Sequence, residues 1–285
     1  MNAIVLLIQS ADKKGLLAGI SGFFAERDYN ILHCQQYTDT EHGHYFMRLK
    51  VEDHGQIAHQ ELQQQFQTLA ETMQLSWSMH YSNVPYRVAL LVTKASHCPY
   101  DLLLRELEGE LKCQITLVIG NHADLQNMAQ QFNKPFYHLP ITAETKPQQE
   151  AQIKNLLTEY QIELIVMARY MQVLSEQFVA EYAGKVINIH HGFLPAFQGA
   201  KPYHQAYERG VKLIGATAHY ATAELDEGPI IEQDVERVRH DNSPEELVMI
   251  GKDIERLVLA RAVKAHIEHR IIVSGRRTIV FAEGA

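Results

Sequence analysis

Residues 185–207 have the sequence KVINIHHGFLPAFQGAKPYHQAY. The segment opens with an apolar run, which predicts the end of a buried strand, and it continues with glycines and prolines, which predict a loop. Asn188 and His190 are two residues apart, so a strand would project their side chains to the same face. Asp226 belongs to a second loop, ELDEGPI at residues 224–230. An amide, an imidazole and a carboxylate are therefore expected to meet where two loops leave a sheet, a set suited to attack on a carbonyl-type carbon.

Strands and helices alternate on the N-terminal side of this segment, starting at about residue 86. Apolar runs predict strands of a parallel sheet at residues 88–92, 114–119, 136–139, 163–167 and 186–189. Helices are predicted between them, near residues 102–107, 123–132, 147–160 and 175–182. This alternation predicts a doubly wound, mostly parallel sheet, whose ligands bind beyond the carboxyl ends of the strands. Asn188, His190 and the segment Arg169–Met171 lie at such ends.

The last third of the chain departs from simple alternation. Residues 216–220 and 230–235 are predicted as strands that flank the loop of Asp226. Ser243, Pro244 and Glu246 then form a strong helix start, with a serine N-cap, a proline at the first helical position and a capping box. This helix is expected to run to about residue 269. A closing strand pair is predicted at residues 271–273 and 279–281.

The first 80 residues predict a separate small domain. Strands are expected at residues 2–9, 30–38, 45–51 and 75–81, with helices starting at Leu16 and spanning about 58–73. The order βαββαβ is the ferredoxin-like arrangement. A polar segment with a proline, residues 82–85, is typical of a linker. We therefore predict an α/β protein with one domain at residues 1–83 and a second at residues 86–285.

Composition excludes several classes of protein. The chain has 285 residues, 46% hydrophobic and 21% charged, and a net charge of -8, which argues against a broad surface for nucleic acid. No apolar run reaches the ~18 residues of a membrane span, and the N-terminus lacks the features of a signal peptide. Three cysteines without CxxC spacing fit no disulfide framework. A cytoplasmic protein without nucleic-acid or membrane partners is expected.

Common cofactor and nucleophile motifs are absent from the sequence. There is no GxGxxG, GxxxxGK[ST], HExxH or GxSxG pattern. The chain has 16 histidines, but His190 and His191 would point to opposite faces of a strand, and no trio has regular ligand spacing. Neither a metal nor a cofactor is expected.

The N-terminal domain resembles the ACT domains, which are small regulatory modules that commonly pair and bind amino acids. The resemblance is carried by the order βαββαβ, by the motif DKKGL at residues 12–16 and by Asn30 at the start of a strand. It implies an effector site at Asp12, Gly15, Leu16 and Asn30, amino-acid effectors such as glycine and methionine, and a homo-oligomer. The alternative is that residues 12–15 only form the loop that begins a helix.

The second domain resembles the formyltransferase-fold enzymes that use 10-formyltetrahydrofolate. The motifs are Asn188-Ile-His190, Leu194-Pro195 and LDEGPI at residues 225–230, with MARYMQVLS at residues 167–175 similar to the folate-adjacent loop. Residues 190–197 and 199–207, together with an ACT unit in front, resemble the deformylase branch. Gly192 stands where that branch usually has serine, and its conformational freedom favours the same loop.

The resemblance implies hydrolysis of the N10-formyl group to formate and tetrahydrofolate, within one-carbon metabolism and purine biosynthesis. It implies catalysis by Asn188, His190 and Asp226, through an amide donor to the oxyanion and acid–base chemistry. The residues expected to bind substrate are Arg169, Tyr170, Met171, Gly192, Leu194 and Pro195. Whether His190 or Asp226 first takes the proton is left open. The alternatives are a formyltransferase with an amine acceptor and a non-catalytic sensor of amino acids or folate.

Overall fold

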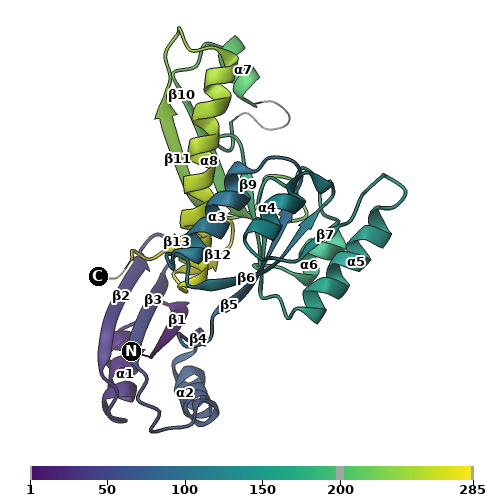
Figure 1. Ribbon diagram of the computed structural model, residues 1–285. Helices are drawn as coiled ribbons and strands as arrows, with labels where there is room; N and C mark the ends of the chain where they lie inside the picture. The colour runs from purple at the N-terminus through teal and green to yellow at the C-terminus, as the bar shows by residue number, and fades with distance from the viewer. Residues whose placement is uncertain (1, 197–201, 284–285) are drawn as a thin grey trace. The chain divides into compact units, whose positions relative to one another are not determined.

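The computed structural model of the chain describes residues 2–196 and 202–283 and divides into two compact units. The first unit contains the residues up to Pro85, Glu268–Ser274 and the residues from Thr278 onward. The second unit contains Tyr86–Ile267 and Gly275–Arg277. Figure 1 labels most of the helices and strands of the two units.

The first unit is built on a four-stranded sheet with the strand order β2-β3-β1-β4. Its strands are β1 (Ala3–Ala11), β2 (Ile31–Asp39), β3 (His44–Glu52) and β4 (Ser76–Tyr81), and its helices are α1 (Leu16–Ala25) and α2 (His59–Met73). The helices bury residues at helical spacing, such as Ile20 and Phe24 in α1 and Leu62 and Phe66 in α2. These side chains form one core with the strands, and the predicted βαββαβ order is confirmed.

The C-terminal segment groups with this first unit. Strands β12 (Ile271–Ser274) and β13 (Arg277–Val280) form a two-stranded sheet. Ile272 and Phe281 pack with Phe46 of β3 in a small apolar cluster. The sequence assigns all of residues 86–285 to the second domain. The structure differs because burying these apolar side chains ties the end of the chain to the first sheet.

The second unit contains a seven-stranded sheet with the strand order β11-β10-β9-β8-β5-β6-β7. Its strands are β5 (Tyr86–Val92), β6 (Cys113–Gly120), β7 (Phe136–His138), β8 (Leu164–Met167), β9 (Val186–His190), β10 (Leu213–Tyr220) and β11 (Ile230–Arg237). Strands β5 to β9 are parallel, whereas β10 pairs antiparallel with both β9 and β11. The predicted mostly parallel sheet is confirmed.

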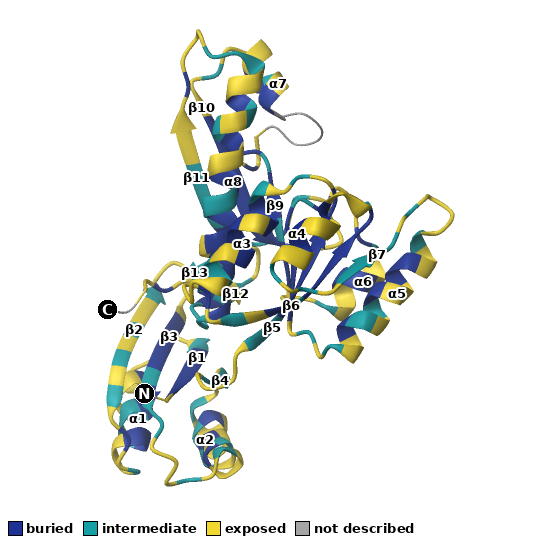
Figure 2. Ribbon diagram, in the orientation of Figure 1, coloured by how far each residue is buried: buried dark blue, intermediate teal, exposed yellow. Residues whose placement is uncertain are grey.

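Helices cover the central strands on both faces. All residues of Val88–Val92 in β5 are buried (Figure 2), as expected for a strand between two helical layers. The helices are α3 (His97–Leu107), α4 (Gln126–Gln131), α5 (Lys146–Glu159), α6 (Glu176–Glu181), α7 (Pro202–Glu208) and α8 (Pro244–Ile267), with a 3-10 turn at Ala123–Leu125. Helix α7 lies where the sequence predicts a loop. Within the described residues, no helix is both long and apolar enough to cross a membrane.

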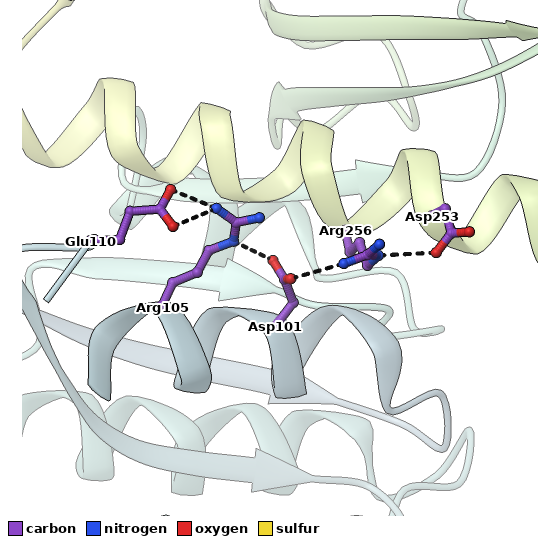
Figure 3. Close-up of polar contacts among 5 residues, drawn as sticks. All are labelled: Asp101, Arg105, Glu110, Asp253 and Arg256. Carbon is purple, nitrogen blue, oxygen red and sulfur yellow. Dashed lines mark hydrogen bonds and ion pairs between the residues drawn. The ribbon is translucent and has the colours of Figure 1, made fainter. Parts of the chain in front are cut away.

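Helix α8 begins with the predicted capping box. The backbone N–H of Ser243 donates to the carboxylate of Glu246 at 2.8 Å, and the N–H of Glu246 donates to Ser243 Oγ at 3.2 Å. Helix α8 is tied to α3 by charged side chains, which Figure 3 shows. Asp101 of α3 pairs with Arg105 at 2.6 Å and with Arg256 of α8 at 3.4 Å. The pair of Asp101 with Arg256 therefore links the two helices, and the pair with Arg105 lies within α3.

Candidate active site

A cavity of about 300 Å³ lies beside strand β9 in the second unit. Its lining comes from a contiguous part of the chain, between Met167 and Asp226. The lining residues are Met167, Arg169–Leu174, Val179, Asn188–His191, His219, Ala221, Thr222 and Glu224–Asp226. The predicted catalytic residues Asn188, His190 and Asp226 thus share one cavity with the predicted binding segment Arg169–Met171.

His190 and Asp226 form a pair. Nδ1 of His190 lies 3.2 Å from Oδ2 of Asp226, and the imidazole is only 5% exposed. Because the carboxylate accepts a hydrogen bond, we assign the proton of a neutral His190 to Nδ1. Nε2 of His190 has no hydrogen-bond partner among the described residues, so its lone pair is available to a reacting group in the cavity.

His219 orients the amide of Asn188, although no motif of the sequence points to this residue. It stands opposite Asn188 in the antiparallel pair of β10 and β9. Its Nδ1 lies 3.0 Å from the carbonyl oxygen of Tyr220, which makes Nδ1 the donor, and its Nε2 then accepts from Nδ2 of Asn188 at 3.2 Å. Burial lowers the pKa of His219, which keeps this ring neutral. One amide proton of Asn188 is thereby committed, and the other remains for a ligand.

Asp226 is ionised despite its burial. Burial by itself would raise its pKa, but the hydrogen bond with His190 and the charge interactions with the neighbouring histidines lower it. Its backbone φ is 57°, in the left-handed region that few non-glycine residues adopt. A carboxylate held in this way is a poor proton acceptor and a good partner for a cationic imidazole.

Gly228 gives the Asp226 loop its close contact with β10. A Cβ atom at this position would lie 1.7 Å from the carbonyl oxygen of Tyr220. No side chain fits there unless the loop moves, and the same loop carries Asp226. The glycine is therefore required by backbone packing.

We expect Gly228→Ala to destabilise the protein by about 1–3 kcal/mol through overpacking, and to lower activity because the loop shifts Asp226. Urea denaturation and initial rates would measure both effects. Gly22→Ala is the matched control, because a Cβ at Gly22 in helix α1 meets nothing within 4 Å. It should be neutral or slightly stabilising. Equal behaviour of the two variants would contradict the packing argument.

The segment Arg169–Leu174 forms one wall of the cavity and is anchored from outside. The N–H of Met171 donates to Thr93 Oγ1 at 2.9 Å. The hydroxyl of Tyr170, which is buried, donates to Gln149 at 3.3 Å. Arg169 has a φ of 63°. Sequence reasoning did not single out Thr93 or Gln149 as supports, since they stand in other parts of the chain.

Gly192, Leu194 and Pro195 lie in the turn after β9 and are not among the described residues that line the cavity. The buried hydroxyl of Thr217 donates to the carbonyl oxygen of Gly192 at 2.9 Å and accepts from the N–H of Leu194 at 3.0 Å. The bond from Leu194 to Pro195 is cis. These three residues therefore shape the turn that follows His190, and Thr217 holds it in place.

His191, next to His190 in sequence, has a different environment. Burial, together with the charge of Arg169, lowers its pKa to about 4. It is therefore neutral near pH 7, and it lines the same cavity.

The predicted effector residues lie at two places in the first unit. Asp12 and Gly15 are exposed in the loop before α1, and Gly15 has a φ of 89°. Leu16 is only 2% exposed and belongs to the core, so its side chain supports the helix. Asn30 is exposed immediately before β2, and its carbonyl oxygen accepts the N–H of Glu52.

Both units contain residues that match known protein families. Residues 86–263 match the formyl transferase family, and residues 4–59 match the ACT domain. A formyltetrahydrofolate deformylase from Synechocystis sp. is 49% identical, covering 97% of this chain and 98% of that protein. The chain belongs to the formyltetrahydrofolate deformylases. A deformylase from Bacillus subtilis is 44% identical over 97% of this chain and 93% of its own length.

Solved structures agree with this assignment. A formyltetrahydrofolate deformylase from Pseudomonas syringae superposes with a TM-score of 0.97 at 43% identity, covering 99% of this chain and 95% of that one. A glycinamide ribonucleotide transformylase from Symbiobacterium toebii gives a TM-score of 0.67 at 27% identity, with 70% of this chain and 95% of that chain covered. Likeness to deformylases extends over nearly the whole chain, and likeness to this transformylase over part of it.

Proposed function

We propose that the chain hydrolyses 10-formyltetrahydrofolate to formate and tetrahydrofolate in the cavity beside β9. The observation that carries the proposal is the His190–Asp226 pair, at 3.2 Å, in one cavity with the amide of Asn188. An oriented imidazole, its carboxylate and a hydrogen-bond donor are what addition of water to a formyl carbon requires. Relatives of nearly the same length named formyltetrahydrofolate deformylase support the same reaction.

In the proposed first step, Nε2 of His190 takes a proton from water as the water oxygen bonds to the formyl carbon. Asp226, whose pKa is lowered, stays ionised and stabilises the imidazolium that forms. The formyl oxygen becomes an oxyanion and accepts the remaining N–H of Asn188. His190 then returns the proton to N10, and the carbon–nitrogen bond breaks as the oxyanion reforms the carbonyl. Tetrahydrofolate and formic acid leave, and the acid loses its proton to solvent as formate. Side chains of the protein carry every step, so we propose neither a metal nor a cofactor.

The deciding experiment supplies purified protein with 10-formyltetrahydrofolate and no acceptor. We expect formate and tetrahydrofolate in equal amounts. Release that needs an added amine would make the protein a formyltransferase. No release under either condition would leave only a sensor of folate or amino acids.

The ACT unit is the proposed site of regulation. We propose that it binds a free amino acid, with glycine and methionine as the candidates, beside the exposed loop of Asp12 and Gly15. Pairing of ACT units between copies of the chain would make the protein a homo-oligomer. We propose neither a nucleic acid nor a membrane as a partner.

We expect Asp12→Ala to remove the response of the turnover rate to glycine or methionine and to leave the basal rate within about twofold, because this exposed carboxylate could pair with the amino group of an effector. Rates measured with and without each amino acid would test this. Glu71→Ala, at an exposed carboxylate of α2, is the control and should keep the response. An unchanged response in Asp12→Ala would remove the assignment.

A further inference from the structure

A second group of polar side chains is buried in the same unit, outside the set that handles the substrate. At its centre is Glu255 of helix α8, whose side chain is 1% exposed. Its carboxylate accepts from the hydroxyl of Tyr203 at 2.8 Å and lies 2.7 Å from Nε2 of His97. It also forms an ion pair with Arg169, with Nε at 3.3 Å. Arg169 is therefore the link from this group to the cavity wall.

The carboxylate of Glu255 is charged. Burial would raise its pKa, but the hydrogen bond with His97 and the charge of Arg169 lower it. A buried charge costs stability unless it is paired, and an apolar residue would fill the same space at least as well. Packing alone therefore does not account for a glutamate here. The position of the carboxylate accounts for the glutamate, because this carboxylate pairs with the guanidinium of Arg169, a residue whose backbone is strained.

Arg169 needs such a partner. Its φ of 63° lies in the left-handed region, and such conformations persist where surrounding contacts determine them. Nε and Nη1 of Arg169 are buried and have no hydrogen-bond partner within the described part of the chain, so Glu255 holds the group by charge. This ion pair fixes the first residue of the wall Arg169–Leu174.

Gly251, one turn before Glu255 in helix α8, leaves space for the ring of Tyr203. A Cβ at Gly251 would lie 2.1 Å from the ring of Tyr203, so only glycine lets that ring pass the helix and reach the carboxylate. Glycine in a helix interior is unfavourable. His97 is brought from the other side by α3, which the ion pair of Asp101 with Arg256 links to α8 (Figure 3).

A cation is not the best explanation of this group. His97, Cys98 and Glu255 place potential ligand atoms within 4.8 Å of one another. However, the guanidinium of Arg169 already neutralises the carboxylate and would repel a divalent cation.

We propose that Glu255 is a positioning residue for the reaction: held by His97 and Tyr203, it fixes Arg169 and so keeps the cavity wall in place for the folate. The inference rests on the proposed function, because it names a further residue that this reaction needs. Glu255 acts through Arg169 and does not itself touch the substrate.

A double-mutant cycle tests this coupling. We expect Glu255→Gln to raise KM for 10-formyltetrahydrofolate by about 10–100-fold, with a smaller change in kcat, since misplaced binding groups weaken binding. Arg169→Gln should have a similar effect, and the double variant should be no worse than Arg169→Gln alone. Multiplied effects would overturn the proposal. Glu245→Gln, which neutralises an exposed carboxylate in the first turn of the same helix, is the control and should keep KM within twofold.

Two further measurements test the proposal even if Glu255→Gln does not fold. Tyr203→Phe keeps the ring and removes one hydrogen bond to Glu255, so it should fold even if Glu255→Gln does not. We expect it to raise KM by about 3–10-fold, and an unchanged KM would contradict the proposal. The Kd of tetrahydrofolate, measured by calorimetry, should rise in the same variants. Wild-type protein that binds tetrahydrofolate but releases no formate would refute the proposed function alone.

Discussion

Replacing Asp226 with asparagine is expected to lower kcat by about 10³–10⁴-fold with little change in the fold. The amide keeps the shape of the side chain, but it carries no charge to stabilise the imidazolium of His190. Its N–H₂ group can also turn toward Nδ1, which would place the histidine proton on Nε2 and remove the base. Single-turnover rates of formate release and a thermal unfolding curve would measure the two properties.

The control for this variant is Asp124→Asn, at an exposed aspartate of the same unit. It should turn over at the wild-type rate. A kcat of Asp226→Asn within tenfold of the wild type would exclude the proposed role of the carboxylate. A large drop in stability would instead show that the ion pair with His190 mainly supports the fold.

Replacing Asn188 with alanine should lower kcat by about 10²–10³-fold, because the oxyanion loses a fixed donor. KM should change much less, since the hydrogen bond strengthens as charge develops in the transition state. The change also leaves Nε2 of His219 without its donor at 3.2 Å. Steady-state kinetics over a range of substrate concentrations would separate the two constants.

Asn155→Ala provides the same substitution at an exposed position of helix α5 and should have wild-type kinetics. If Asn188→Ala raised KM and left kcat intact, the amide would bind the ground state and not the oxyanion. A loss shared equally by kcat and kcat/KM is the expected pattern.

The period of two along a strand was enough to place Asn188 and His190 together, and the apolar runs were enough for the parallel sheet. His219 was beyond this reasoning because its position depends on how β10 pairs with β9. In the pairing of β10 with β11, the register shifts at a bulge between Ala218 and His219. No periodicity in the sequence predicts this bulge.

Glu255 was missed for a different reason. The sequence gives no reason to single it out, because glutamate is rarely buried without a partner and its partners cannot be identified from the sequence. Its partners His97, Arg169 and Tyr203 come from three other segments, and only the folded chain brings them within reach. The C-terminal strand pair illustrates the same limit, since its apolar residues could have packed on either domain.

The contiguous lining of the cavity has a consequence for transplanting this chemistry to another scaffold. A graft of residues 167–226 would carry every described lining residue, including Asn188, His190 and Asp226. It would leave behind Thr93, Gln149 and Glu255, which hold the wall from outside that segment. A recipient protein that carried only this segment would thus have the reacting groups without the contacts that hold the cavity wall. Restoring those three contacts should be the first step in repairing such a chimera.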